Sequence, residues 1–90
     1  MNKTIITVVG KDTVGIIAKV CTYLADNGIN ILDISQKLMQ NLFTMISLID
    51  LEKSSITLEE LTAELEKVGE ELNVAITILP ENMFRSVHND

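Results

Sequence analysis

The spacing of apolar residues changes within the first thirty positions of the chain. Residues 4–9 form a short run rich in β-branched side chains that stops at Gly10, which predicts a strand. From Asp12 onward the apolar positions recur at steps of three and four, the spacing of one helix face. These positions are Ile16, Ile17, Val20, Cys21 and Leu24. The sequence Asp-Asn-Gly at residues 26–28 ends this predicted helix, with Gly28 at its carboxyl-terminal cap.

Two longer apolar stretches follow, over residues 29–40 and 42–51, and both are typical of strands. The polar pair Gln40 and Asn41 lies between their apolar parts, which favours a tight turn. These stretches therefore predict an antiparallel hairpin of two long strands.

A second helix and a last strand complete the pattern. Thr57 followed by Glu60 is the signature of a capping box, which marks a helix start. Gly69 lies inside the expected helix and weakens the prediction of its last turn. Residues 74–79 predict a fourth strand that ends at Pro80. The apolar positions of the second helix, at three- and four-residue steps, are Leu58, Leu61, Leu65, Val68 and Leu72.

The predicted order is strand, helix, strand, strand, helix, strand. This is the ferredoxin-like βαββαβ order of an α+β fold, with a four-stranded antiparallel sheet and both helices on one face. Residues 1–80 are expected to form one domain. Residues 81–90 form a tail, in which Met83, Phe84 and Val87 suggest one apolar side of a short helix.

The strands carry apolar residues on both faces, which bears on assembly. An antiparallel sheet with one face in water alternates apolar with polar residues, yet residues 5–9 and 42–49 are apolar on both sides. A partner subunit or the tail is therefore expected to cover the second face, and a homodimer is the favoured interpretation.

The composition of the chain argues against several classes of function. The 90-residue chain carries a formal net charge of −6, which argues against a nucleic-acid or acidic membrane surface. One cysteine and one histidine argue against a structural zinc site within one chain, and no cofactor is expected. The apolar run before Gly10 is too short for a signal peptide or membrane span, so a cytoplasmic location is expected.

The sequence VVGKDTVGIIAKVCTYLADNGINILDISQ, residues 8–36, resembles the opening half of an ACT domain, a small amino-acid-sensing regulatory module. The family pattern places Asp12, Gly15, Gly28, Asn30 and Ile31 at its motif positions. The resemblance extends over about residues 3–79, and the rest is similar to small standalone ACT proteins related to the glycine-cleavage repressor. Many relatives have proline where this chain has Val14, which leaves the loop less rigid.

The resemblance implies a ligand site at the turn between the first strand and the first helix. Gly15, expected in the first helical turn, either lets a ligand carboxylate approach bare N–H groups or only permits close packing. Asp12 either caps the helix or meets the ammonium group of an amino acid. Asn30 is either a turn residue or an amide that reaches the ligand across a dimer interface. The candidate ligand-binding residues are Lys11, Asp12, Val14, Gly15, Ile16, Asn30 and Ile31.

No catalytic constellation can be argued from spacing. Acylphosphatases share the predicted fold but need an arginine in the loop after the first strand, and the sole arginine here is Arg85. The expected function is a dimeric regulatory module that binds a small amino acid and acts on a protein partner, rather than an enzyme. The alternative is a protein-interaction or dimerisation module whose ligand site is vestigial.

Overall fold

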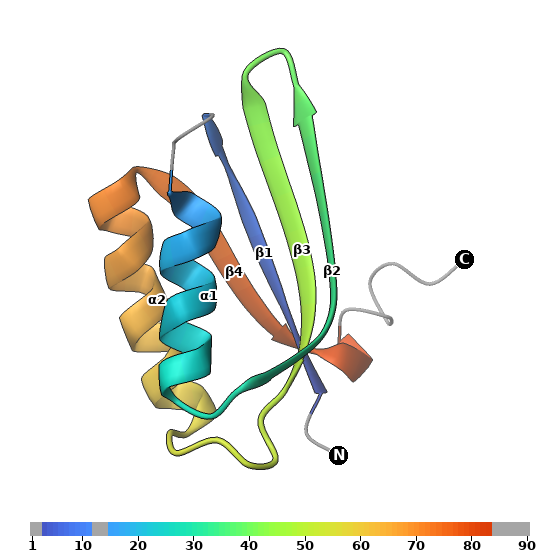
Figure 1. The fold of residues 1–90 in the computed structure, drawn as a ribbon, viewed down its shortest axis with the longest axis vertical. Coiled ribbons are helices and arrows are strands. Elements are labelled where there is room, and N and C mark those ends of the chain that lie inside the picture. The colour runs from blue at the N-terminus through green and yellow to red at the C-terminus, as the bar shows by residue number, and fades with distance from the viewer. Residues whose placement is uncertain (1–2, 12–14, 84–90) are drawn as a thin grey trace.

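The computed structural model describes residues 3–11 and 15–83, and the element order confirms the predicted α+β fold. Figure 1 shows the six elements. Their bounds are β1 Lys3–Lys11, α1 Ile16–Asp26, β2 Asn30–Met39, β3 Leu42–Asp50, α2 Leu58–Leu72 and β4 Val74–Pro80.

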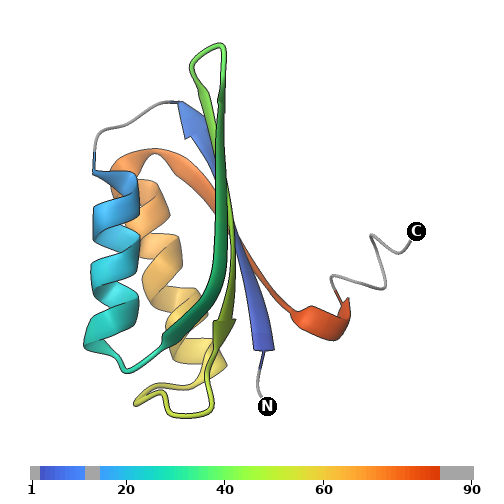
Figure 2. The same cartoon turned by 45° about the vertical axis from the view of Figure 1, so that its right-hand side comes forward.

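The four strands form one antiparallel sheet in the order β2-β3-β1-β4. Both helices lie on one face of this sheet (Figure 2), as the ferredoxin-like order requires. In the hairpin, Gln40 and Asn41 have φ values of 48° and 73° and join Met39 to Leu42. Two successive left-handed residues are the mark of a type I′ turn, so the predicted tight hairpin is confirmed.

The core fills the space between the helices and the sheet. Amphipathic spacing directs one stripe of each helix against alternate strand residues, which removes these side chains from water. Residues with at most 1% of their surface exposed include Ile6, Val8, Ile16, Val20, Leu24, Met45, Ile49, Leu61 and Leu65. Ile17 and Cys21 were predicted to lie on the apolar face of α1, but they are only partly buried.

Helix α2 begins as its sequence predicts. The Glu60 N–H donates to Thr57 Oγ1 at 3.1 Å, and the Thr57 N–H donates to Glu60 Oε1 at 2.9 Å. This reciprocal capping box satisfies two N–H groups that the helix itself leaves unpaired. The helix continues through Gly69 to Leu72, and a Cβ on Gly69 would lie 2.9 Å from the Val74 carbonyl oxygen. Gly69 therefore admits the start of β4 and does not shorten the helix.

Two glycines near the first corner lie differently from expectation. Gly10 is not the exit of β1, because the strand continues to Lys11 and Gly10 pairs with both Phe43 and Val74. Gly15 is not inside the first helical turn, since it is the N-cap residue and α1 begins at Ile16. The three-and-four spacing predicts where a helix face lies but does not locate the first helical residue.

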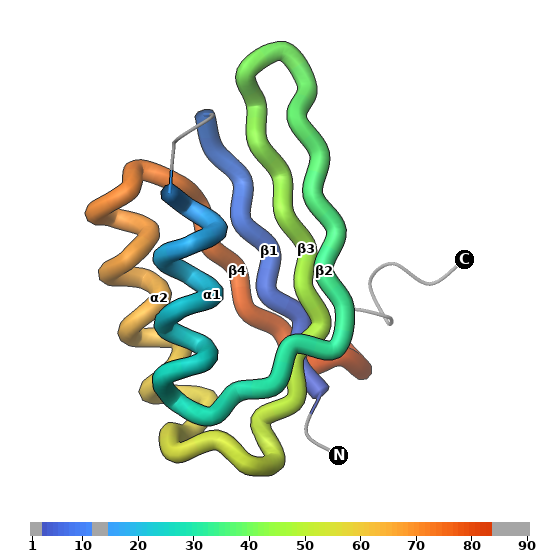
Figure 3. The backbone as a smooth tube through the Cα atoms, in the orientation of Figure 1, coloured from blue at the N-terminus to red at the C-terminus, as the bar shows by residue number. Residues whose placement is uncertain are grey.

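The sheet face that points away from the helices, called here the open face, is largely apolar on β1, β3 and β4, whereas β2 contributes mainly polar residues. Strand pairing places on it Ile5 and Val9 of β1, Met39 of β2, Leu42, Ile46 and Leu48 of β3, and Leu79 of β4. Several of these remain exposed, including Val9 at 38% and Ile46 at 40%. The β2–β3 hairpin also projects beyond the helices (Figure 3), which leaves Leu38 57% exposed.

The chain after β4 begins a helical turn at residues 81–83, on the side of the sheet opposite the helices (Figure 2). This agrees with the predicted short helix, while Phe84 and Val87 lie outside the described residues. Within residues 3–11 and 15–83, no helix is long and apolar enough to cross a membrane.

Candidate ligand-binding site

The candidate site starts at the corner where Gly15 precedes α1. Gly15 has φ 92° and ψ −2°, a left-handed conformation that glycine adopts without a Cβ penalty. The residue is exposed, and a Cβ built on it would meet no atom of the described residues within 4 Å, its chain neighbours apart. The corner therefore presents backbone beside open space rather than a close packing contact, which favours the ligand-approach interpretation of this glycine.

Backbone N–H groups at this helix start have no partner inside the helix. The first intrahelical bond runs from the Lys19 N–H to the Gly15 carbonyl at 2.9 Å, so the N–H groups of residues 16–18 lie before it. Among the described residues, no side chain caps this end and no acidic side chain lies in the first turn. Among the described residues, the partial positive charge of the helix start therefore has no negatively charged side chain beside it.

The other residues predicted beside Gly15 have distinct positions. Ile16 is 1% exposed and anchors the first turn of α1 in the core, so only its backbone can face a ligand. Lys11 is exposed at the end of β1, level with Leu42 of β3. Asp12 and Val14 lie outside the described residues, and the roles predicted for them stay predictions. The N-cap position itself belongs to Gly15.

Strand β2 starts near the carboxyl-terminal end of α1, opposite the end that Gly15 caps (Figure 1), and Asn30 and Ile31 are its first two residues. The 11-residue helix spans roughly 17 Å at 1.5 Å per residue, so one chain does not bring Asn30 to the Gly15 corner. Asn30 is exposed at the start of the edge strand β2, and Ile31 packs partly buried against the core. A separate depression of about 370 Å³ is lined by Gly28, Asn30, Asp50, Glu52 and Lys53.

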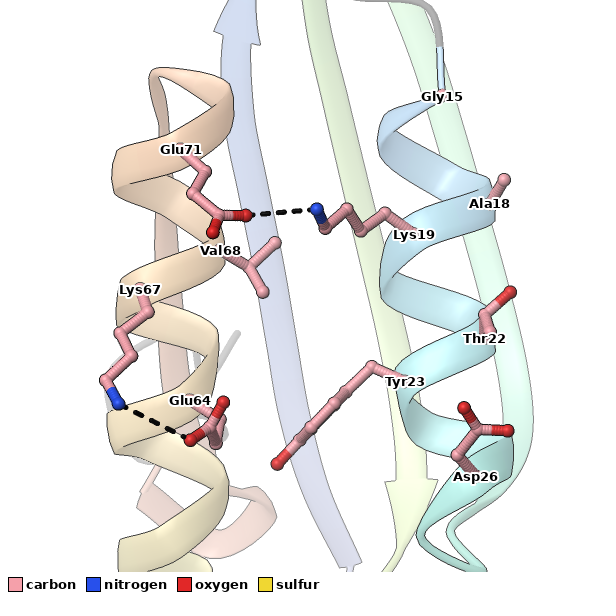
Figure 4. Close-up of a pocket in the computed structure, with 10 residues that line it drawn as sticks. All are labelled: Gly15, Ala18, Lys19, Thr22, Tyr23, Asp26, Glu64, Lys67, Val68 and Glu71. Carbon is pink, nitrogen blue, oxygen red and sulfur yellow. Dashed lines mark ion pairs between the residues drawn. The ribbon is translucent and has the colours of Figure 1, made fainter.

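A groove of about 640 Å³ runs from Gly15 between the two helices, and the residues that line it are labelled in Figure 4. Lys19 and Glu71 bridge it with an Nζ–Oε1 distance of 3.0 Å, one helical turn from Gly15. Tyr23 extends from α1 toward α2 farther along the groove. Sequence reasoning did not select these groove residues, although Lys19 and Tyr23 are spaced four apart on one helix face.

Partial burial raises the pKa of the Tyr23 hydroxyl, and the nearby carboxylates of Glu64 and Glu60 raise it further. All three influences favour the neutral phenol, so Tyr23 enters the groove as an uncharged hydrogen-bonding group. In the described part of the chain, no three histidine, cysteine, aspartate or glutamate side chains gather to hold a metal ion.

Comparison with known proteins places the chain in a family. The family model described as an ACT domain matches residues 2–78. A UPF0237 protein of Clostridium acetobutylicum is 51% identical over 86 residues, which cover 96% of this chain and 97% of that protein. These matches span almost the whole length of both sequences.

Solved structures agree with this assignment. An ACT domain protein from Streptococcus pneumoniae superposes with a TM-score of 0.80 at 41% identity, covering 92% of this chain and 93% of that one. A putative glycine cleavage system transcriptional repressor superposes with a TM-score of 0.76 at 22% identity, over 88% of this chain and 45% of that one, and shares the fold. The chain belongs to the ACT domain family, whose members are typically small-molecule regulatory modules.

Proposed function

We propose that this protein binds a small amino acid at the β1–α1 corner and acts as a dimeric regulatory module. The observation that carries the proposal is the open space at Gly15, beside a helix start without an acidic residue in its first turn. A carboxylate seated there would accept hydrogen bonds from N–H groups of residues 16–18, and the helix dipole would stabilise its charge.

The remaining ligand groups require other partners. An amino acid carries an ammonium group beside its carboxylate, and the carboxylate of Asp12 is the partner that the family resemblance assigns to it. The side chain of the ligand would point toward the groove between α1 and α2, which begins at Gly15. Bulky ligands would meet the Lys19–Glu71 pair one turn along, so we expect a preference for small amino acids.

A second copy of the chain would bring an Asn30 to the Gly15 corner, from which Asn30 of the same chain is distant. Strand pairing sets Met39 level with Leu42 and Lys11, at the Gly15 end of the sheet, whereas Asn30 lies at the far end. Strand β2 is an edge strand whose outer side has no partner within the described chain. Antiparallel pairing of two β2 edges would bring Asn30 of one copy to the Gly15 end of the other, where its amide would meet the ligand.

Ligand binding across such an interface would act on the assembly. A molecule held by both copies binds the dimer better than the monomer, so it would shift the population toward the paired form. The regulated partner would then recognise one form better than the other, which is the requirement for allosteric control.

The test is thermal unfolding in the presence of each amino acid in turn. A ligand at about 100 times its dissociation constant adds about 2.7 kcal/mol of stability, so the melting temperature should rise clearly. Gly15→Ala should abolish that rise, because its Cβ occupies the open space. Gly28→Ala is the matched control, since Gly28 also has positive φ, at 69°, but lies at the other end of α1.

Both glycine substitutions carry backbone strain, so both should lower the melting temperature without ligand. Only Gly15→Ala should also lose the ligand-dependent rise. If no amino acid at millimolar concentration raises the melting temperature of the unaltered protein, the proposed sensing function is wrong.

The exposed hairpin favours a second candidate function, a protein-interaction module with a vestigial ligand site. Leu38 and Met39 are 57% and 54% exposed near the hairpin tip, where an apolar contact with another protein could form. This candidate predicts a partner complex whose dissociation constant is unchanged by any amino acid. The sensing module predicts a dissociation constant that depends on the amino acid that raises the melting temperature.

A further inference from the structure

The open face offers a further surface for assembly, distinct from the β2 edge. Residues that pair across the four strands form rows that cross the sheet. The central row on this face consists of Ser35, Ile46, Thr7 and Thr77. The row below contains Asp33, Leu48, Ile5 and Leu79, and the row above contains Lys37, Thr44, Val9 and Ala75. Across these three rows, Asp33 and Lys37 are the only charged residues, and both lie on β2.

The two charges are placed symmetrically about the central row. Asp33 lies two residues before Ser35 and Lys37 lies two residues after it, on the same strand and face. Within the described chain, neither side chain forms an ion pair with another residue, and the Asp33 carboxylate accepts only the Ile34 N–H, at 2.9 Å. Two opposite charges equidistant from one point match an identical strand laid over them in the reverse direction.

We propose that a second copy of this chain packs its open face against this one, with the strands antiparallel about a two-fold axis that runs along the central row. Asp33 of each copy then faces Lys37 of the other, and Ile46 lies near Ile46 of the second copy. An isologous contact of this kind is self-complementary, and two sheets packed face to face lie about 10 Å apart.

The shape of the face agrees with the charge pattern. A depression of about 210 Å³ lies among Ile5, Asp33, Ser35, Ile46, Leu48 and Glu81. The two-fold arrangement places the row of the second copy that contains Val9 over the row that contains Ile5 and Leu48. Val9 is 38% exposed in one copy, so its side chain is available to enter the depression of the other.

Residues 81–83 of the same chain border this face at Glu81, and Val9 and Ile46 remain exposed beside them. A second copy fits that exposed part better than a strongly charged partner does, because the face carries charges of both signs, from Asp33, Glu81 and Lys37. Lys3 and Lys11 lie at the ends of β1, outside the three rows, and Lys3 is level with Asp50. The contact also goes beyond the proposed function, because it leaves the β2 edge and the Gly15 corner free.

The decisive experiment compares Ile46→Glu with Ala63→Glu by light scattering. Ile46 is 40% exposed on the open face, whereas Ala63 is exposed on α2, away from both the open face and the β2 edge. Ile46→Glu places a charge at the two-fold axis and should halve the assembly mass. Ala63→Glu should leave the mass unchanged, with circular dichroism confirming that both variants fold. An unchanged mass for Ile46→Glu overturns the proposal.

A mixing experiment tests the antiparallel arrangement. Asp33→Lys and Lys37→Asp each create facing like charges, so each variant alone should associate about tenfold more weakly. In an equimolar mixture, the two lysines of one variant would face the two aspartates of the other, and association should recover. Recovery of this kind can come only from contacts between chains, so failure of the mixture to recover overturns the arrangement.

The experiments can contradict the amino-acid-binding proposal and the open-face contact independently of each other. Ile46→Glu should retain any rise in melting temperature caused by an amino acid, since its position is far from the Gly15 corner. Loss of mass with a retained ligand effect supports the face contact, and an unchanged mass with a retained ligand effect overturns it alone.

Discussion

Gly10 and Gly15 flank the β1–α1 corner, and each is a glycine for its own physical reason. A Cβ on Gly10 would lie 2.5 Å from Val74 Cγ1 and 3.0 Å from Val74 Cβ, so the position has no room for a side chain. Gly15 has ample room but a φ of 92°. The sequence locates the corner correctly, yet it cannot show why position 10 requires glycine, because Val74 lies far away along the chain.

Gly10→Ala should destabilise the fold by about 1–3 kcal/mol, the usual cost of overpacking a well-filled site. Val74→Ala removes the closest atom, Cγ1, and should relieve part of that cost in the double variant. Urea unfolding of the two single variants and the double variant measures the coupling. Additive free energies of unfolding would contradict the steric explanation.

Tyr23 can be titrated directly, because the chain contains one tyrosine and no tryptophan. Burial and the carboxylates of Glu64 and Glu60 raise its pKa, so tyrosinate absorbance should appear at a pH above the ordinary value of about 10. Glu64→Gln should lower the pKa of Tyr23. Glu66→Gln removes an equal charge from an exposed site on the same helix and serves as the control.

The raised pKa of Tyr23 determines how its contribution to the free energy of unfolding changes with pH. A phenol whose pKa is higher in the folded state stabilises the fold fully below the unfolded pKa, and this contribution falls as the pH rises through the folded pKa. Tyr23→Phe should therefore lose less free energy of unfolding above about pH 10 than the unaltered protein does. Equal losses in both proteins would show that Tyr23 does not contribute.

At the scale of elements, the sequence predicts helix starts and turns best where residues close along the chain determine the local backbone conformation and its hydrogen bonds. The capping box at Thr57 and the hairpin turn at residues 40–41 depend on neighbouring residues, and both were predicted correctly. The start of α1 was predicted less well, since Gly15 caps it without a side chain. A helix whose N-cap residue has no side chain lacks the local signal that normally marks its start.

Thr57→Ala should destabilise the protein by about 1 kcal/mol, because the Glu60 N–H loses its acceptor. Thr62→Ala is the matched control within the same helix, where the Thr62 hydroxyl donates to the Leu58 carbonyl and alanine has the higher helix propensity. Chemical unfolding should show a clear loss for Thr57→Ala and little or none for Thr62→Ala. Equal losses would contradict a specific role for the capping box.

The candidate site shows the limit of sequence reasoning between elements. The residues from Lys11 to Ile16 are neighbours along the chain, so their proximity follows from the sequence. Asn30 was expected to approach them only across a dimer interface, and its place at the other end of α1 is compatible with that expectation but does not test it. The relative placement of copies depends on surfaces that residue spacing describes only in part.

At the scale of the whole molecule, the sequence predicted an apolar second sheet face, and the structure confirms that face. The sequence could not predict which residues of neighbouring strands lie opposite each other. This register is set jointly by the hairpin turn and by the bulge between Ile31 and Asp33. Only with the register known does the symmetry of Asp33 and Lys37 about Ser35 become visible.

Assembly should make the melting temperature depend on protein concentration. Folding coupled to association is favoured by mass action, so a roughly hundredfold dilution should lower the melting temperature, on the order of 10 °C for a chain of this size. Ile46→Glu removes one of the two proposed contacts and should show a weaker dependence, whereas Ala63→Glu should match the unaltered protein. A melting temperature that stays constant across that dilution in the unaltered protein would contradict both proposed contacts, because a monomer's unfolding equilibrium contains no concentration term.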